Sequence, residues 1–355
     1  MKISIGILAY NEADTIAPTL RSLFSQSLLT DPSHPWQVEV VVVPNGCRDA
    51  TATVSEGLLA QLTTSLGHGR VTARVCEVTR PGKSNAWNLF VHEFSDPAAQ
   101  YLLLMDADIL FIEPETLENV IGTLETTPEA WVSTDRPVKD VFFKAQKTWS
   151  DRLSMAASRV SGGNASWICG QLYGGRAEVL RRIWMPLDIR VEDGFLWMMV
   201  VTDGLRSPTD LRRVRRADRA SHQFEAYTGL EGLFKHERWQ IVGNTINSLI
   251  YEEIQRAVGQ DQPAGAYVAQ RNRDNPRWVA ELTQAAVESR RWRVIPRSLV
   301  FRRFRSLQNR SLPLAIALFP VVLAAFLLDL VIVFQALGEL SREGDRQFRP
   351  SSQLS

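Results

Sequence analysis

Two carboxylates one residue apart could bind a metal ion, because they directly follow an apolar stretch of the chain. The stretch covers residues 101–105, and Asp106-Ala107-Asp108 comes next. A short run of Leu and Met that ends in charged residues is typical of a buried strand in a parallel sheet. Ligands of open α/β sheets bind just outside the carboxyl ends of such strands, where two hard oxygen donors suit a divalent cation that also holds phosphate. For Asp-x-Asp alone, a solvated junction between strand and loop is the alternative.

Three further polar segments follow predicted strands in the same way. Tyr10-Asn11-Glu12 follows the first strand, residues 44–51 follow the second, and residues 82–88, which include Lys83, follow the third. All four segments should converge, because the carboxyl ends of parallel strands lie at one edge of a sheet. Together they offer polar groups for a base, a lysine for phosphate and carboxylates for a metal. The pattern therefore predicts a nucleotide-binding site.

The elements that must position these residues alternate between strand and helix from the start of the chain. Apolar residues recur at helical spacing after each predicted strand, so that each helix presents one apolar face. The predicted strands cover residues 3–9, 38–43, 71–78 and 101–106, and the predicted helices cover 11–25, 49–62, 83–89 and 114–124. This order predicts an α/β fold with a mainly parallel sheet and helices on both faces.

The second half of the chain has a less regular pattern. We expect surface helix and mobile loop over residues 139–163. Further on, the pattern predicts a strand at 167–170, a short helix at 176–183, a helix at 192–201 and largely helical structure at 226–257. Six arginines lie between residues 206 and 219, and they form either a solvated face or a site for an anionic acceptor.

The order of these motifs resembles that of the family 2 glycosyltransferases, enzymes with the GT-A nucleotide-binding fold. The resemblance covers residue 1 to about residue 205. It implies a binding site for a nucleotide-sugar donor, formed by Tyr10, Glu12, Asn45, Lys83, Asp106 and Arg238. Pro44-Asn45 stands where the family often has two carboxylates, so the identity of the base stays open.

The resemblance also implies a divalent metal cofactor, Mg²⁺ or Mn²⁺, with Asp106, Asp108 and His222 as its ligands. For His222 a purely structural role is the alternative, because a lone His is more often structural. Arg238-Trp239 keeps only the last two residues of the Gln-x-x-Arg-Trp motif found in members that build polymers. This departure argues against processive synthesis, while Arg238 is still expected to brace the leaving diphosphate.

A further match to the family lies at residues 190–196, which look like its Glu-Asp motif. The Asp of that motif acts as catalytic base, a role that falls to Asp193 here. Inverting sugar transfer needs such a base, because the acceptor hydroxyl must lose its proton as it attacks the anomeric carbon. Asp193 is also suited to cap the helix predicted after it, and the two roles are compatible.

Composition excludes some classes of protein. The chain has 355 residues and a formal net charge of +1, which gives no reason to expect a nucleic acid partner. Three scattered cysteines, an odd number, argue against a disulfide framework and fit a reducing compartment. The N-terminus enters a strand without a secretory signal pattern, so we expect the folded part to be cytoplasmic.

The C-terminal region is basic and then apolar. Eight arginines between residues 290 and 310 precede an uncharged stretch at 312–328, which Asp329 interrupts before the apolar pattern resumes to residue 334. A membrane span needs ~20 apolar residues, and an excess of arginine marks the cytoplasmic side of a membrane. We expect membrane association, as a span or an in-plane helix, with an apolar helix buried in the fold or in a dimer as the alternative.

These patterns divide the chain into four parts. Residues 1–225 are expected to form the GT-A catalytic domain, 226–290 a helical acceptor-side region, 291–338 a basic segment with a membrane-associated helix, and 339–355 a polar tail. The expected function is metal-dependent, inverting transfer of a sugar from a nucleotide-sugar donor to an acceptor hydroxyl. The acceptor is expected to be a lipid, a lipid-linked sugar or another saccharide at the cytoplasmic face of the cell membrane.

Two alternatives belong to other classes. A nucleotidyltransferase would also combine a parallel sheet with acidic metal ligands, but it would carry a Gly-rich, lysine-bearing loop after the first strand, where Tyr10-Asn11-Glu12 stands. A non-catalytic membrane scaffold of the same fold is the second alternative. The presence of Asp106, Asp108 and Asp193 together argues against it.

Overall fold

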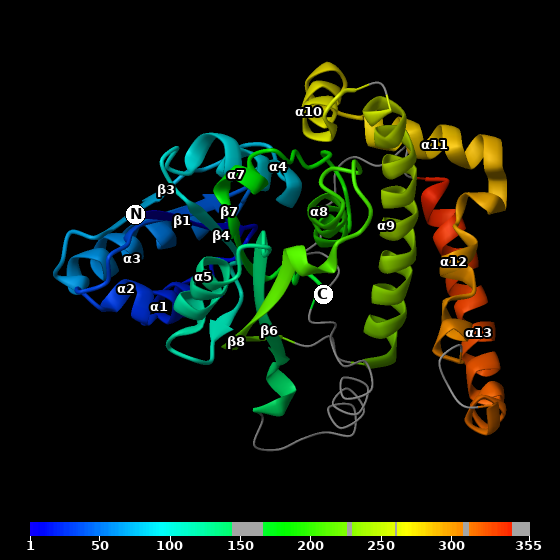
Figure 1. Ribbon diagram of the computed structural model, residues 1–355, viewed down its shortest axis with the longest axis horizontal. Coiled ribbons are helices and arrows are strands. Elements are labelled where there is room, and N and C mark those ends of the chain that lie inside the picture. The colour runs from blue at the N-terminus through cyan, green and yellow to red at the C-terminus, as the bar shows by residue number, and fades with distance from the viewer. Residues whose placement is uncertain (144–165, 226–228, 260, 308–311, 343–355) are drawn as a thin grey trace.

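The N-terminal half forms the parallel part of a sheet, as the alternating pattern predicts. The computed structural model describes residues 1–143, 166–225, 229–259, 261–307 and 312–342. Four parallel strands lie in the order β3-β2-β1-β4 (Figure 1). Their bounds are β1 Lys2–Ala9, β2 Gln37–Pro44, β3 Val71–Val75 and β4 Tyr101–Asp106. Because they run in one direction, the segments after β1, β2 and β4 meet at one edge.

The sheet continues beyond β4 with mixed pairing, and the described part of the chain contributes eight strands to it. Strand β7 pairs antiparallel with β4, and β6 pairs antiparallel with β7 and parallel with β8. The added strands are β5 Leu110–Phe111, β6 Val132–Lys139, β7 Leu172–Arg176 and β8 Val214–Phe224. The strand predicted at 167–170 is wrong in position, because β7 begins at Leu172 and residues 166–170 form turns.

A glycine in β7 explains why that strand lacks the apolar pattern of the others. A Cβ atom on Gly174 would come within 2.7 Å of Leu103 Cδ2 and 2.8 Å of Val120 Cγ1. These two side chains therefore fill the space that a larger residue would need, and β7 can lie against β4 and α5 only with Gly here.

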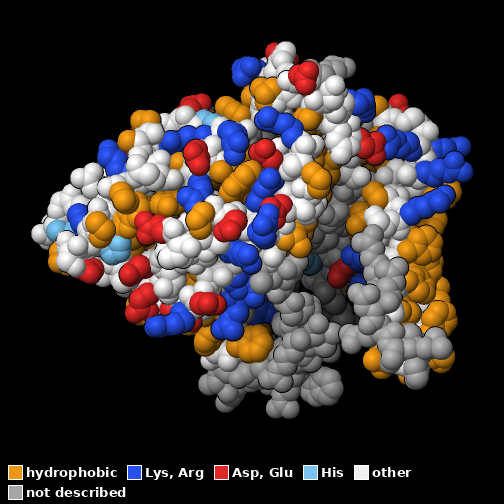
Figure 2. Space-filling view, in the orientation of Figure 1, with side chains coloured by type: hydrophobic (Ala, Val, Ile, Leu, Met, Phe, Trp, Pro, Cys, Tyr) orange, Lys and Arg blue, Asp and Glu red, His pale blue; other side chains and the backbone are white. Residues whose placement is uncertain are grey.

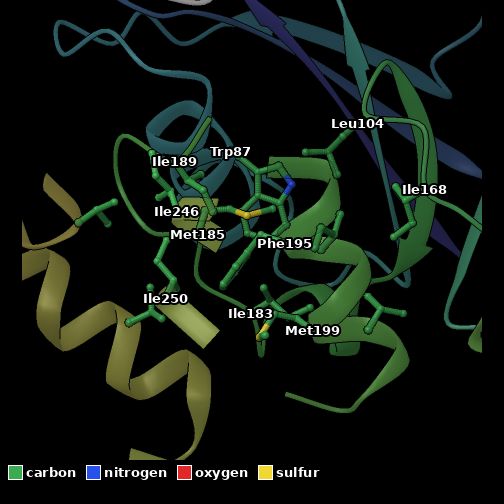
Figure 3. Packing of buried hydrophobic residues seen from close by; sticks show 14 of the residues in the cluster. Trp87, Leu104, Ile168, Ile183, Met185, Ile189, Phe195, Met199, Ile246 and Ile250 are labelled. Carbon is green, nitrogen blue, oxygen red and sulfur yellow. The ribbon is translucent and has the colours of Figure 1, made fainter. Parts of the chain in front are cut away.

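Helices cover both faces of the sheet and enclose two hydrophobic clusters. One cluster contains Ile5 and Val40 beneath α1 and α5, and the other contains Val41 and Leu104 beneath α4 and α8. The helices of this part are α1 Ile16–Phe24, α2 Ser27–Thr30, α3 Thr51–Leu66, α4 Lys83–Leu89, the π-helical turn η1 Phe90–Phe94, α5 Thr116–Thr126, η2 Asp140–Phe142, α7 Ala177–Leu180, α8 Glu192–Val201 and η3 Leu211–Arg213. Trp87, Met185 and Phe195 pack together at the centre of the second cluster (Figure 3).

The predicted helices occur with shifted boundaries. Helix α1 begins later than residue 11, because Asn11 has a positive φ of 53° and the backbone of residues 12–15 forms a turn. Helix α8 has the predicted bounds, and α9 Gly229–Val258 confirms the helical structure predicted after residue 226. Most of the segment predicted as surface helix and loop, from 144 to 163, lies outside the described residues.

The C-terminal third is a layer of helices around α9, which packs against the second cluster of the sheet domain (Figure 1). Its members are α10 Ala264–Asp274, α11 Trp278–Arg290, η4 Arg291–Val294, α12 Arg297–Val300, η5 Arg302–Leu307 and α13 Leu312–Leu340. Helices α9 and α13 lie side by side. In α13, residues 316–340 are long and apolar enough to cross a bilayer, which is a property of length and composition only.

Candidate active site

A cavity at the carboxyl end of β4 brings together three residues that the sequence pattern singles out. Lys83 from the start of α4, Asp106 from the end of β4 and Asp193 from the start of α8 all line it, together with Glu192 and Gly170. Apolar residues such as Trp87 and Met185 form the rest of its wall. The cavity is thus lined by one cationic side chain, several carboxylates and apolar side chains.

Lys83 is the cationic centre of this cavity. Its Nζ atom lies 2.7 Å from Asp106 Oδ1 and 3.0 Å from Glu192 Oε1. Burial alone would lower the pKa of Lys83, but the charges of these two carboxylates outweigh burial and raise it well above its usual value. Lys83 is therefore a permanent positive charge. The sequence pattern does not identify Glu192 as an ion-pair partner of Lys83, although its position next to Asp193 is a signal that it lies in the site.

Several carboxylates lie close together around Lys83, so their negative charges repel one another. Burial is the main reason that the pKa of Asp106 rises to about 6, and the charges of Asp108 and Glu192 add to it against the effect of Lys83. Desolvation by the surrounding loops and the nearby Glu12 also raise the pKa of Asp108, although its side chain reaches solvent. Burial and the charge of Asp106 raise the pKa of Glu12 as well. An added cation would relieve this concentration of negative charge.

Asp106 and Asp108 fit a divalent cation that shares its coordination with a substrate. Both are hard oxygen donors at the same strand end, and they are the groups whose repulsion a cation would remove. In the described part of the chain, no three His, Cys, Asp or Glu side chains form a ready-made metal cage. Mg²⁺ commonly takes one or two carboxylates from a protein and completes its shell with phosphate and water.

Asp193 lies in the first turn of α8 and lines the same cavity as Lys83. The N-cap of α8 is Val191, so the predicted capping role for Asp193 is wrong; its Oδ1 instead accepts a hydrogen bond of 2.7 Å from the N–H of Gly194. A Cβ atom on Gly170 would come within 3.1 Å of Asp193 Cβ, so a glycine there leaves room for the carboxylate. Burial, followed by the charge of Glu192, raises the pKa of Asp193 to about 6. A buried carboxylate with such a pKa can accept a proton near neutral pH.

The comparison with protein families decides the class of this site. Residues 4–184 match the family described as "Glycosyl transferase family 2". The chain belongs to this family. It is therefore a glycosyltransferase, and the matched segment contains Lys83, Asp106 and Asp108 from the cavity and its rim. No match was found among curated protein sequences.

Several solved structures are similar to this chain at low identity. S. aureus TarS is 17% identical with a TM-score of 0.42, over 67% of this chain and 38% of that one, so this chain spans well under half of its length. TarS 1–349 is 14% identical with a TM-score of 0.47, over 98% and 93% of the two chains. Glucosyl-3-phosphoglycerate synthase from Mycobacterium tuberculosis, in complex with Mn²⁺, uridine-diphosphate-glucose and phosphoglyceric acid, is 20% identical with a TM-score of 0.42, over 65% and 74%.

Asn45 of this glycosyltransferase braces the loop that carries Lys83. Its side chain is buried, its Nδ2 donates to the carbonyl of Ala9 at 2.7 Å, and its Oδ1 accepts from the N–H of Gly82 at 3.0 Å. The amide therefore joins the end of β1 to the start of α4. The contact with the base that the family resemblance implies for Asn45 stays a prediction.

Tyr10 and Glu12 lie at the same edge, in the loop after β1. Tyr10 is half-buried, and the backbone N–H of Glu12 donates to Thr51 Oγ1 at 2.8 Å. The side chain of Glu12 accepts a hydrogen bond from Thr15 and lies close enough to Asp106 and Asp108 to affect their charges. Glu12 is thus placed near the carboxylates of the site. The contacts of Tyr10 and Glu12 with a nucleoside stay predictions.

His222 is buried beneath this edge. Its Nδ1 lies 2.7 Å from Asp135 Oδ2, and its Nε2 lies 3.3 Å from Gln171 Oε1. These contacts fix the ring between β6 and the loop before β7. His222 lies close enough to Asp108 to lower the pKa of that carboxyl in part. It is not part of any three-ligand group in the described residues, and its role as a metal ligand stays a prediction.

Arg238 does not line the cavity. Its Nε lies 3.1 Å from Glu339 Oε2, and its Nη1 donates to Gln335 Oε1 at 3.3 Å, so that this arginine of α9 binds the last turns of α13. Arg190 Nη1 binds the other oxygen of Glu339 at 2.7 Å. Sequence analysis missed Glu339, because its partners lie far away along the chain. The predicted contact of Arg238 with the donor diphosphate would require it to leave Glu339.

Proposed function

We propose that this glycosyltransferase transfers a sugar from a nucleotide-sugar donor to an acceptor hydroxyl with inversion at the anomeric carbon. The observation that carries the proposal is that Lys83, Asp106 and Asp193 line the same cavity. Lys83 and Asp106 would hold the donor, with Tyr10, Glu12 and Asn45 at the nucleoside. Asp193 would face the acceptor.

The donor diphosphate needs positive charge when it leaves. Lys83 supplies one charge, but two carboxylates already neutralise it. A divalent cation, Mg²⁺ or Mn²⁺, held by Asp106 and Asp108 would supply Lewis-acid stabilisation of the departing diphosphate. The metal is proposed because the carboxylates of Asp106 and Asp108 are hard oxygen ligands, which suit such a cation.

Asp193 would accept the proton of the acceptor hydroxyl. As that proton moves to a carboxylate oxygen, the hydroxyl oxygen forms a bond to the anomeric carbon, and the bond between this carbon and the diphosphate breaks with its electron pair going to the diphosphate. Attack from the face opposite the leaving group inverts the configuration. The raised pKa of Asp193, about 6, leaves it ionised at neutral pH and still basic enough to act.

The acceptor is proposed to be a lipid, a lipid-linked sugar or another saccharide at the cytoplasmic face of the cell membrane. The apolar helix α13 and the arginines before it support a membrane location. The family assignment favours sugar transfer over nucleotidyl transfer. A scaffold without activity would bind donor but not turn it over.

A screen of nucleotide sugars tests the proposal. We expect one class of donor to raise the melting temperature only in the presence of Mg²⁺ or Mn²⁺, because a ligand of the folded state stabilises it by mass action. The purified enzyme should also hydrolyse that donor slowly or transfer its sugar. Stabilisation by nucleoside triphosphates instead of nucleotide sugars would favour a nucleotidyltransferase, and binding without turnover would favour the scaffold.

The pH dependence of kcat/KM should reflect Asp193. The rate should rise with pH through an apparent pKa near 6, so that at pH 5 it is about tenfold below the plateau reached near pH 8. The free energy of unfolding should depend on pH in the opposite direction. The folded state takes up protons on Asp106 and Asp193 at a higher pH than the unfolded chain, so these groups favour the fold more as pH falls from 7 towards 4. A pH-independent rate, measured with saturating metal, would contradict the assignment.

A further inference from the structure

Helix α13 carries a stripe of exposed apolar residues that no other part of the described chain covers, and Val321 and Leu328 on another side of the helix are also exposed. Ile316, Leu323, Leu327, Val331 and Phe334 recur at helical spacing, and their exposed fractions range from 38% to 78%. A stripe of this kind is unusual on a soluble surface, where large apolar patches mark interaction sites. Figure 2 shows the apolar side chains of α13 along one edge of the molecule.

On its opposite face, α13 is attached to the rest of the protein by ion pairs of Asp329, which lies near the middle of the helix. Asp329 is 2% exposed, and the Nε atoms of Arg302 and Arg303 each lie 2.9 Å from its Oδ2. Glu237 of α9 also pairs with both arginines. Burial would raise the pKa of Asp329, but the hydrogen bonds and charges of the two guanidinium groups outweigh burial and lower it.

This charged cluster argues against a membrane span. Asp329 lies at the middle of residues 316–340, so a spanning α13 would carry Asp329, its two arginines and Glu237 to the centre of the bilayer. Charged side chains at that depth are costly and therefore rare in membrane-spanning segments. Helix α9, which lies alongside, has no membrane-spanning composition and would have to enter with α13.

The C-terminal end of α13 is attached in the same way. Ala336 and Leu340 are fully buried in the cluster that α8 and α9 share. Glu339 binds Arg190 and Arg238, and Arg190 comes two residues before Glu192 of the cavity. Withdrawal of α13 into a membrane would leave these arginines without the carboxylate. The helix is therefore a fixed part of the catalytic domain.

A basic and aromatic rim adjoins the apolar face. Arg291, Arg293 and Arg297 are exposed, and Trp292 between the first two is 66% exposed with the Arg293 guanidinium 5.5 Å from its ring centre. Figure 2 shows basic side chains gathered at the end of α11, next to the apolar edge. Tryptophan and arginine are the residues that favour the headgroup region of a membrane.

We propose that α13 is an in-plane docking helix that rests on an anionic bilayer and does not cross it. Its outer face enters the boundary between headgroups and acyl chains, the arginines of the rim contact lipid phosphates, and its inner face stays on α9. An apolar helix face at a membrane interface binds by buried apolar area together with attraction to anionic lipids. The catalytic domain and both ends of α13 then lie on the same side of the membrane.

Vesicle binding by the full chain tests the surface without use of the transferase activity, so its failure is separate from failure of the proposed sugar transfer. We expect co-sedimentation with vesicles that contain phosphatidylglycerol, and weaker binding to pure phosphatidylcholine. The double variant Val331→Glu with Phe334→Glu should bind at least about tenfold more weakly, because it places charge in the apolar face. The control Leu211→Glu alters an exposed apolar residue elsewhere and should bind normally.

Three measurements distinguish docking from its alternatives. Protease added outside the vesicles should remove a C-terminal tag, and alkaline carbonate should release the protein; a protected tag or resistance to carbonate would show a span and overturn the proposal. Sedimentation of the free protein should show the same oligomeric state for the double variant and the unaltered chain. Dimers that the double variant dissociates, together with no binding to either kind of vesicle, would assign the face to a second copy and also overturn it.

Discussion

The Asp193→Asn variant should transfer sugar about 10²–10⁴-fold more slowly than the unaltered enzyme, the usual contribution of a positioned general base. Asparagine keeps the size of the side chain and can still accept the hydrogen bond from Gly194 N–H, but it cannot take a proton from the acceptor. Donor affinity should be nearly unchanged, because the donor is expected to contact Lys83 and Asp106. Transfer rate, donor affinity and melting temperature measured on this variant check the expectation.

A purely structural role for Asp193 predicts a different result. The rate would then change little, and stability would fall by at most ~1 kcal/mol, as for a lost helix-terminal contact. Glu192→Gln is the matched control, because it removes the neighbouring charge and keeps a group that can bind Lys83. Near-normal transfer by Asp193→Asn would mean that the base lies elsewhere, and Glu192 would be the first candidate.

The Asp108→Ala variant should lose the metal-dependent rise in melting temperature that a nucleoside diphosphate causes. Asp106 and Asp108 together would repel a diphosphate, so donor binding should require the cation that they hold. Saturating ligand at about 100 times its Kd stabilises a folded protein by about 2.7 kcal/mol, and this increment should disappear. Thermal shift with and without Mg²⁺ or Mn²⁺ measures the difference.

The fold of the variant should stay intact, because Asp108 reaches solvent and replacing it relieves repulsion from Glu12. Asp14→Ala is a suitable control, since Asp14 is exposed in the loop after β1 and should leave the shift unchanged. An undiminished shift in Asp108→Ala would remove Asp108 from the metal site.

The N-terminal half of the fold could be predicted because its signals are local. Buried parallel strands are apolar runs, and each helix after them repeats its apolar residues with a period near 3.6. The rule that strand ends share one edge then placed Lys83 and Asp106 together, as the cavity confirms. The mixed half of the sheet could not be predicted in the same way, because β7 contains Gly174 and Gly175 where apolar residues would have marked a strand.

By itself the sequence determined the α/β class, the family and the carboxylates at the end of β4. Only the tertiary structure decided what Asn45, Arg238 and α13 do. Asn45 binds backbone groups of two other segments, and Arg238 binds Glu339 of a helix that lies far along the chain. From its sequence pattern, the basic and apolar C-terminal region looks like a separate segment. In the structure, Asp329 and Glu339 join it to the rest of the protein, and their partners lie in α9, in η5 and in the segment before α8. Ion pairs of this kind leave no periodic pattern, because they depend on which helices pack together and not on spacing along the chain.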